Sequence, residues 1–124
     1  MSCIILVAED EVIVRNTVRL LLEREGHEVL VATDGFEALE LSRQYHGTID
    51  LVLTDVKMPR MDGLALVEQL LKERPGIKIL VMSGQISTVD LDKLQPLAFL
   101  RKPFSPETFR NKIREVLKAP PLVN

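Results

Sequence analysis

Five short apolar runs, separated by segments with helical periodicity, constrain the fold of this chain more than any other feature. The runs are residues 4–8, 28–32, 50–54, 77–82 and 98–100. The first, third and fourth are continuous in Ile, Leu and Val, which is typical of strands buried on both faces of a parallel sheet. The second run has polar residues beside it and is expected at an edge of the sheet.

Helical patterns occupy the segments between these runs. Apolar residues recur at helical spacing in 12–25, in about 35–45, from 64 to the "RPG" at 74–76, and from about 106 to the "APP" at 119–121. Pro106 stands where a first helical residue is expected, and the two prolines at 120–121 form a stop. The segment from 83 to 98 predicts at most two or three helical turns, capped by Ser87 and ended by Pro96.

The resulting order, βαβαβαβαβα, predicts an α/β fold in which a parallel sheet carries helices on both faces. Right-handed crossovers leave few topologies open, and at this size the flavodoxin-like (βα)5 fold with strand order 2-1-3-4-5 is the leading one. The sequence contains no internal repeat, linker or low-complexity segment. We therefore expect residues 1–124 to form a single domain.

Composition excludes several classes of protein. Of the 124 residues, 46% are hydrophobic and 27% charged, which is ordinary for a globular domain. The net charge of −2, without a basic run, argues against nucleic-acid binding. No apolar run approaches the roughly 20 residues that span a membrane, and no signal peptide is visible, so a cytoplasmic location is expected. The single cysteine, Cys3, excludes an internal disulfide and is expected to be a buried strand residue.

Residues capable of chemistry follow four of the five predicted strands. They are Glu9, Asp10 and Glu11 after the first, Asp55 after the third, Ser83 after the fourth and Lys102 after the fifth. In an open α/β sheet, ligands bind beyond the carboxyl ends of the strands. Strand order 2-1-3-4-5 places the third strand in the centre, so these side chains are expected to converge around Asp55.

The charges of the expected cluster indicate that it binds a cation. Glu9, Asp10 and Asp55 would repel one another unless cations were present, and Lys102 with one Mg²⁺ would balance them formally. Mg²⁺ prefers oxygen ligands, and a carboxylate can act as a nucleophile toward phosphorus. Asp55 is therefore a candidate phosphoryl acceptor. Glu11 is expected only to cap the first helix, since acids favour helix N-termini.

Four segments together resemble a known family. "LVAEDE", "LTDVKMPRMDG", "LVMSG" and "FLRKPF" look like the signature blocks of the response-regulator receiver domain of two-component signalling, including the chemotaxis regulators. The blocks occur in the family's order and cover essentially the whole chain. Taken singly, Asp55, Ser83 and Lys102 would be read as a turn acid, a loop serine and a solvated lysine.

The resemblance implies a phosphoryl-accepting, Mg²⁺-dependent site. Asp55 would take the phosphoryl group from a phosphohistidine on a histidine kinase or histidine phosphotransfer protein. Mg²⁺ would be held by Asp10 and Asp55 directly, by Glu9 through water, and by the backbone carbonyl of Lys57. Glu9 stands where the family more often has Asp, and one extra methylene is easily absorbed by a water-mediated ligand.

The resemblance also implies a conformational switch. Lys102 would pair with the phosphoryl group, and its bond to Pro103 is expected to be cis. Ser83 would turn its hydroxyl onto a phosphoryl oxygen, and Phe99 would turn inward, as a shift between two packings. Phe99 lacks the hydroxyl of a Tyr, so it would act by packing alone. The 19 positions from Ser83 to Lys102 are fewer than usual, by about a helical turn.

Other functions are weighed against this one. A phosphohydrolase that forms an aspartyl phosphate would resemble its relatives in having an Asp where Lys57 stands, so we expect no enzyme of that class. Nucleotide binding is not expected, because no G-x-G-x-x-G follows the first strand. A pseudo-receiver, a protein-binding module that is not phosphorylated, is the remaining alternative.

The sequence leaves the biological context open. The given sequence ends six residues past the last predicted helix, and we expect no output domain within these 124 residues. It is expected to be either a stand-alone regulator or a receiver from a longer protein such as a hybrid kinase. Its output partner is expected to be a separate protein or a fused domain.

Overall fold

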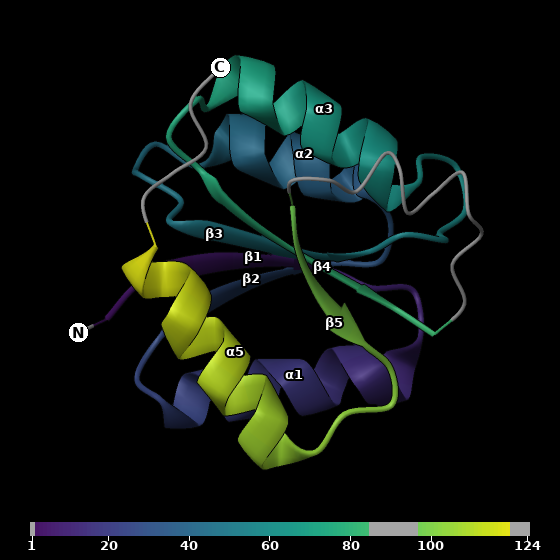
Figure 1. Cartoon of the computed structure of the whole chain (residues 1–124). Helices are drawn as coiled ribbons and strands as arrows, with labels where there is room; N and C mark the ends of the chain where they lie inside the picture. Colours follow the sequence, from purple (N-terminus) through teal and green to yellow (C-terminus); the bar gives the residue numbers. More distant parts are fainter. Residues whose placement is uncertain (1, 85–96, 120–124) are drawn as a thin grey trace.

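Five parallel strands form one sheet at the centre of the computed structural model, which describes residues 2–84 and 97–119 (Figure 1). The sheet order is β2-β1-β3-β4-β5, as the alternation of elements predicts. The strands are β1 (Ile4–Ala8), β2 (Glu28–Ala32), β3 (Leu51–Asp55), β4 (Lys78–Ser83) and β5 (Ala98–Arg101).

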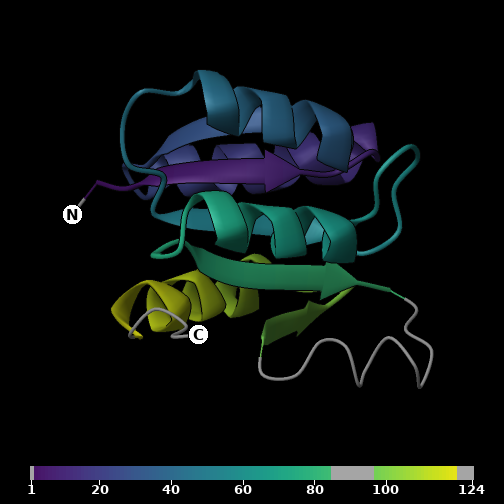
Figure 2. The ribbon, with the colours of Figure 1, turned by 90° about the horizontal axis from the view of Figure 1, so that it is seen from above.

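Two layers of helices cover the sheet. Helices α1 (Val12–Arg24) and α5 (Pro106–Lys118) lie on one face, and α2 (Gly35–Gln44) and α3 (Gly63–Glu73) on the other (Figures 1 and 2). The flavodoxin-like fold predicted from the sequence is thus confirmed. The short helix expected between 83 and 98, with its cap at Ser87 and its stop at Pro96, falls outside the described residues.

Side-chain caps fix where three of these helices begin. Asp34, Asp62 and Ser105 each accept a hydrogen bond from a backbone N–H three residues later, at the starts of α2, α3 and α5. Such caps satisfy N–H groups that have no partner within the helix. Pro106 takes the first position of α5, as predicted, where its missing N–H costs nothing.

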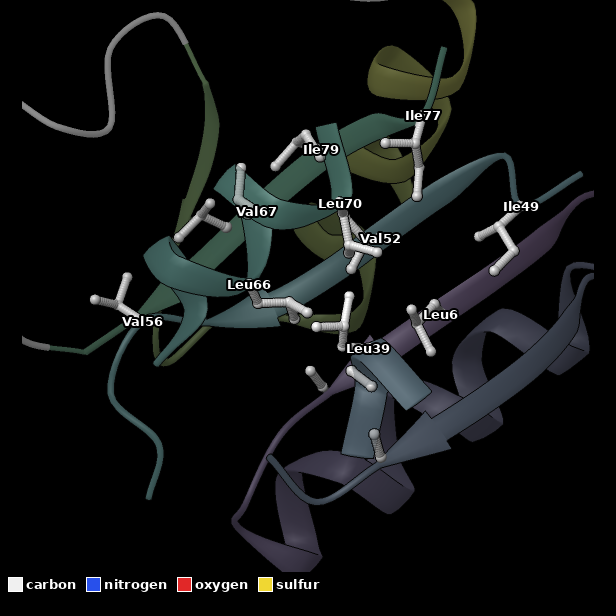
Figure 3. Packing of buried hydrophobic residues seen from close by; sticks show 14 residues of the cluster. Leu6, Leu39, Ile49, Val52, Val56, Leu66, Val67, Leu70, Ile77 and Ile79 are labelled. Atoms are coloured by element: carbon white, nitrogen blue, oxygen red, sulfur yellow. The ribbon is translucent and has the colours of Figure 1, made fainter. Parts of the chain in front are cut away.

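The sheet separates two apolar cores, because alternate residues of each strand point to opposite faces. On the α2 and α3 side, Leu6 and Val52 of the strands pack with Leu39, Leu66 and Leu70 of the helices (Figure 3). The opposite core, against α1 and α5, holds Ile5, Val7, Leu53, Leu80, Met82, Leu22, Phe109 and Ile113, among others. Strands buried on both faces account for the continuous apolar runs.

Three details differ from the sequence prediction. β3 and β4 run one residue later than expected, because Asp55 pairs with Met82, and Ser83 with Arg101, as members of the strands. β5 likewise extends to Arg101. Cys3 precedes β1 and is only partly buried, so its expected place within the strand was wrong. Burial raises the pKa of its thiol.

Among residues 2–84 and 97–119, none of the helices combines the length and the apolar character that crossing a bilayer requires.

Gly63, the first residue of α3, lies against the end of β3 with no space for a side chain. Its N–H donates to the carbonyl of Val56 at 2.8 Å. A Cβ at this position would lie 1.9 Å from the carbonyl oxygen of Asp55 and 3.1 Å from Oγ1 of Thr54. The glycine therefore allows α3 to begin directly against the strand that ends in Asp55.

We expect Gly63→Ala to lower the free energy of unfolding by about 1–3 kcal/mol, because the added methyl group forces backbone to move. Urea denaturation followed by circular dichroism measures this. The control is Gly76→Ala, where a Cβ would meet nothing within 4 Å. Equal stability of the two variants would contradict the close approach at Gly63.

Candidate functional site

The functional residues lie at one edge of the sheet, where the parallel strands end together. Ala8 at the end of β1 is in register with Thr54 of β3, and Asp55 is in register with Met82 of β4. Glu9 continues directly from β1 and remains fully buried. The order of the strands, rather than proximity in sequence, therefore brings the acids together.

Lys102 is the centre of the cluster. Its Nζ lies 2.7 Å from Oε1 of Glu9, 2.7 Å from Oδ2 of Asp55 and 3.3 Å from Oε1 of Glu11. The backbone N–H of Lys102 donates to the carbonyl of Ser83 at 2.9 Å. The bond from Lys102 to Pro103 is cis, as the family resemblance predicts. One ammonium group thus faces three carboxylates contributed by two strand ends and the start of a helix.

Glu9 is the least solvated acid of this group, with an exposed fraction of 0%. Its Oε2 accepts a hydrogen bond from the N–H of Glu11 at 3.1 Å. Its Oε1 is paired with Lys102 by charge, but no hydrogen bond is directed to it. Burial raises the pKa of Glu9 from its ordinary value of 4.5 to about 7, against the opposing effect of Lys102.

The environment of Lys102 favours the charged form of its side chain, whereas that of Glu9 favours the neutral form. Burial alone would lower the pKa of its ammonium group, but the hydrogen bond to Asp55 and the close carboxylate of Glu9 outweigh this and raise it. Lys102 therefore stays charged throughout the physiological range. With one such cation against three acids, the cluster keeps an excess of negative charge.

This donor set fits a divalent cation that prefers oxygen ligands. Oxygen atoms of Glu9, Glu11 and Asp55 lie within 4.8 Å of one another. Oε1 of Glu9 is buried and shares the single ammonium group of Lys102 with Asp55 and Glu11, so a further cation would stabilise it. Mg²⁺ binds through one or two carboxylates with other oxygen atoms, so the residues present suit it.

Asp10 and Glu11 differ from what the sequence suggested. Asp10 is exposed and does not belong to the close group of carboxylates. Its backbone carbonyl accepts a hydrogen bond from Arg15 at 3.4 Å. Glu11 stands at the N-cap of α1 but makes no side-chain cap bond, and its carboxylate reaches Lys102 instead. The expectation that Glu11 only caps the helix was therefore wrong.

The remaining candidate residues lie in β4, in β5 and in the loop that follows β3. Ser83, with an exposed fraction of 2%, ends β4 beside β5. Phe99 of β5 is partly buried against the core on the α2 and α3 side. Lys57 is exposed, two residues after Asp55, in the loop that leads to α3. Sequence reasoning missed the contact of Glu11 with Lys102, since a sequence carries no signal for the direction of that side chain.

Comparison with known proteins gives one consistent family. The family model described as response regulator receiver domain matches residues 5–114. The sensor kinase CckA of Brucella abortus is 36% identical over 120 residues, which cover 94% of this chain and 13% of that protein. The aerobic respiration control protein ArcA of Escherichia coli is 33% identical over 118 residues, covering 91% of this chain and 48% of that one. The chain thus spans about half, or less, of these curated relatives.

Solved structures agree with this result. A receiver domain protein of Methanospirillum hungatei is 30% identical, with a TM-score of 0.85 and 94% of each chain covered. The chemotaxis protein CheY4 of Vibrio cholerae is 27% identical, also with a TM-score of 0.85, over 94% of this chain and 99% of that one.

The pKa of Glu9 predicts a pH dependence of stability. Because its pKa is about 7 in the folded protein and near 4.5 when unfolded, the folded state holds this proton more tightly between those values. Its contribution is complete below pH 4.5 and is lost as the pH rises through 7. In metal-free buffer, we expect Glu9→Gln to reduce the fall in unfolding free energy between pH 5 and about 7.5. Urea denaturation at several pH values measures it.

The control for this experiment is Glu73→Gln. Hydrogen bonds from Arg43 and Gln69 lower the pKa of Glu73 to about 2, so its contribution changes only below pH 4.5. This variant should keep the slope of the wild-type protein between pH 5 and 7.5. A Glu9→Gln protein with that same slope would show that Glu9 is not desolvated as described.

Proposed function

Because this chain belongs to the response regulator receiver domain family of two-component signalling, we propose that Asp55 accepts a phosphoryl group from a phosphohistidine. The donor would be a histidine kinase or a histidine phosphotransfer protein. The observation that carries the proposal is the contact of Asp55 with Lys102 at 2.7 Å, beside an excess of buried negative charge. Receiver domains are signalling modules, so we propose no turnover of a released substrate.

The proposed cofactor is Mg²⁺. Asp10 and Asp55 would hold it directly, Glu9 through water, and Lys57 through its backbone carbonyl. When bound, Mg²⁺ neutralises charge on the phosphoryl oxygens and on the carboxylates around them. The support is the close group of carboxylate oxygens and the buried Oε1 of Glu9. Glu11 adds negative charge to this group beyond the residues that the family resemblance supplies.

The transfer itself needs positioning more than covalent chemistry. A carboxylate oxygen of Asp55 forms a bond to phosphorus while the bond from phosphorus to the donor's imidazole nitrogen breaks. The departing imidazole takes up a proton. Lys102 keeps its charge because of its acidic surroundings, so its ammonium group is available to a phosphoryl oxygen on Asp55.

Phosphorylation would then change the conformation. Ser83 would donate its hydroxyl to a phosphoryl oxygen, and Phe99 would move further into the core that it already contacts. Ser83 belongs to β4 and Phe99 to the neighbouring strand β5. Contacts made only in the phosphorylated form would thus shift the population between two packings.

The partners follow from this function and from the relatives. We propose that residues 1–124 act as one receiver domain, in a stand-alone regulator or in a longer protein. A sensor kinase and a response regulator are among the relatives of which the chain matches only part. The output would belong to a separate protein or a fused domain. We propose a cytoplasmic location, with no contact of this domain with nucleic acid or membrane.

The proposal is tested by intact-mass spectrometry after incubation with acetyl phosphate. One added phosphoryl group is expected in the presence of Mg²⁺ and none in its absence. Asp55→Asn should remain folded and gain nothing. Asp62→Asn is the matched control, because Asn caps α3 as well as Asp does, and this variant should be phosphorylated normally.

Two outcomes would contradict the assignment. Addition to Asp55→Asn would place the phosphoryl group on another residue. A folded wild-type protein that gains nothing, from acetyl phosphate or from a phosphorylated histidine phosphotransfer protein, would instead favour the pseudo-receiver.

The switch is tested separately with Ser83→Ala. We expect this variant to be phosphorylated on Asp55 but to show smaller changes in the NMR signals of Phe99 than the wild-type protein does, because the hydroxyl that would bind a phosphoryl oxygen is missing. Ser42→Ala, which alters a buried serine of α2, serves as control. Identical Phe99 shifts in the Ser83→Ala and wild-type proteins would contradict the coupling.

A further inference from the structure

The loop between β3 and α3, residues 56–62, contains one unusual backbone conformation. Arg60 has φ of +67°, in the left-handed region that residues other than glycine rarely adopt. The N–H of Met61 donates to the carbonyl of Pro59 at 2.8 Å, closing a three-residue turn around Arg60. Turns of this hand are rare and strained, so they persist only where other contacts hold them.

These contacts come from the start of α2, 24 to 26 residues earlier in the chain. Arg60 Nε lies 2.6 Å from Oδ2 of Asp34, and the guanidinium group lies 5.1 Å from the centre of the Phe36 ring. The N–H of Gly35 donates to the carbonyl of Met61 at 3.1 Å. A Cβ on Gly35 would lie 2.5 Å from that carbonyl oxygen, so helix and loop are in direct backbone contact.

Asp34 is suited to hold the loop because it is itself fixed. Its residue is only 4% exposed, and its Oδ1 accepts a hydrogen bond from the N–H of Glu37 at 2.8 Å. Burial alone would raise the pKa of Asp34, but Arg60 and the helix N–H groups lower it, so the carboxylate stays charged. One carboxylate therefore caps α2 with one oxygen and binds the loop with the other.

The same loop begins at the proposed phosphorylation site. Its first residue, Val56, donates its N–H to the carbonyl of Met82 at 3.3 Å and accepts from Gly63 at 2.8 Å. Lys57 follows, and Arg60 is three residues further on. The loop is thus fixed at its base by β4 and α3 and near its middle by Asp34, with Lys57 between the two attachments.

We propose that Asp34 and Arg60 are positioning residues, which fix the backbone of the loop so that the carbonyl of Lys57 is held ready for Mg²⁺. This inference rests on the proposed function, because it concerns the same site. A carbonyl that is already ordered loses less conformational freedom on binding, and affinity rises accordingly. Glycine at position 60 would adopt the same φ without strain but would provide no tether.

Two variants separate the loss of the Asp34–Arg60 ion pair, the tether of the loop, from a loss of the α2 cap or of stability. Asp34→Asn keeps an oxygen for the cap of α2, since Asn caps as well as Asp, but it removes the charge that holds Arg60. Arg60→Gly removes the tether and also the strain. The control is Glu73→Gln, which disrupts another ion pair of α2, that of Arg43 with Glu73 at 2.7 Å near the far ends of α2 and α3.

Three measurements are made on residues 1–124 of each protein: Mg²⁺ affinity by calorimetry, hydrogen exchange of the Gly35 and Met61 amides, and the free energy of unfolding in urea without metal. We expect Asp34→Asn and Arg60→Gly to bind Mg²⁺ about threefold to tenfold more weakly and to exchange these amides faster. Arg60→Gly should lower the Mg²⁺ affinity without lowering the free energy of unfolding. If Arg60 only stabilised the fold, its replacement would lower both. Glu73→Gln should bind Mg²⁺ as the wild-type protein does.

The outcomes distinguish the two proposals. If the wild-type protein binds Mg²⁺ and is phosphorylated on Asp55, but both variants bind Mg²⁺ equally well, the function stands and the positioning inference is overturned. A loss of affinity only in variants of lower stability would overturn it too. A wild-type protein that neither binds Mg²⁺ nor accepts a phosphoryl group overturns the proposed function itself.

Discussion

The contact of a single ammonium group with three carboxylates determines the character of this protein's carboxyl edge. Lys102 neutralises part of the charge of Glu9, Asp55 and Glu11, and it is the cation that pairs with the fully buried carboxylate of Glu9. The compensation is incomplete, and the raised pKa of Glu9 reflects this. Buried acids in excess are costly for stability, but they leave a site that gains from binding a further cation.

The rest of the fold serves to hold these groups in place. The apolar strands are packed against helices on both faces of the sheet, while the polar residues of the site lie at or just beyond the strand ends. Glu9 and Asp55 extend from such strands, and Gly63 lets α3 start against the backbone of Asp55. The loop that follows Asp55 is in turn attached to α2 through Arg60 and Asp34.

The sequence predicted the strand order, both helical layers and the convergence of Asp55 with Lys102, because apolar periodicity and strand ends are local signals. It misplaced the bounds of β3 and β4 by one residue, since Asp55 and Ser83 are polar but still pair within the sheet. The contact of Glu11 with Lys102 and that of Asp34 with Arg60 were not predictable. They join residues 91 and 26 positions apart and depend on side-chain directions that only the folded chain defines.

The central claim is that the excess acids around Lys102 form one divalent-cation site. A titration of ¹⁵N-labelled protein with Mg²⁺, followed by NMR, tests it most directly. Saturable shifts are predicted at the amides of Glu9, Asp10 and Glu11, of Asp55 and Lys57, and of Lys102, with little change at exposed acids such as Glu68. No saturable shift at these amides at millimolar Mg²⁺, or equal shifts at acids across the surface, would contradict the claim.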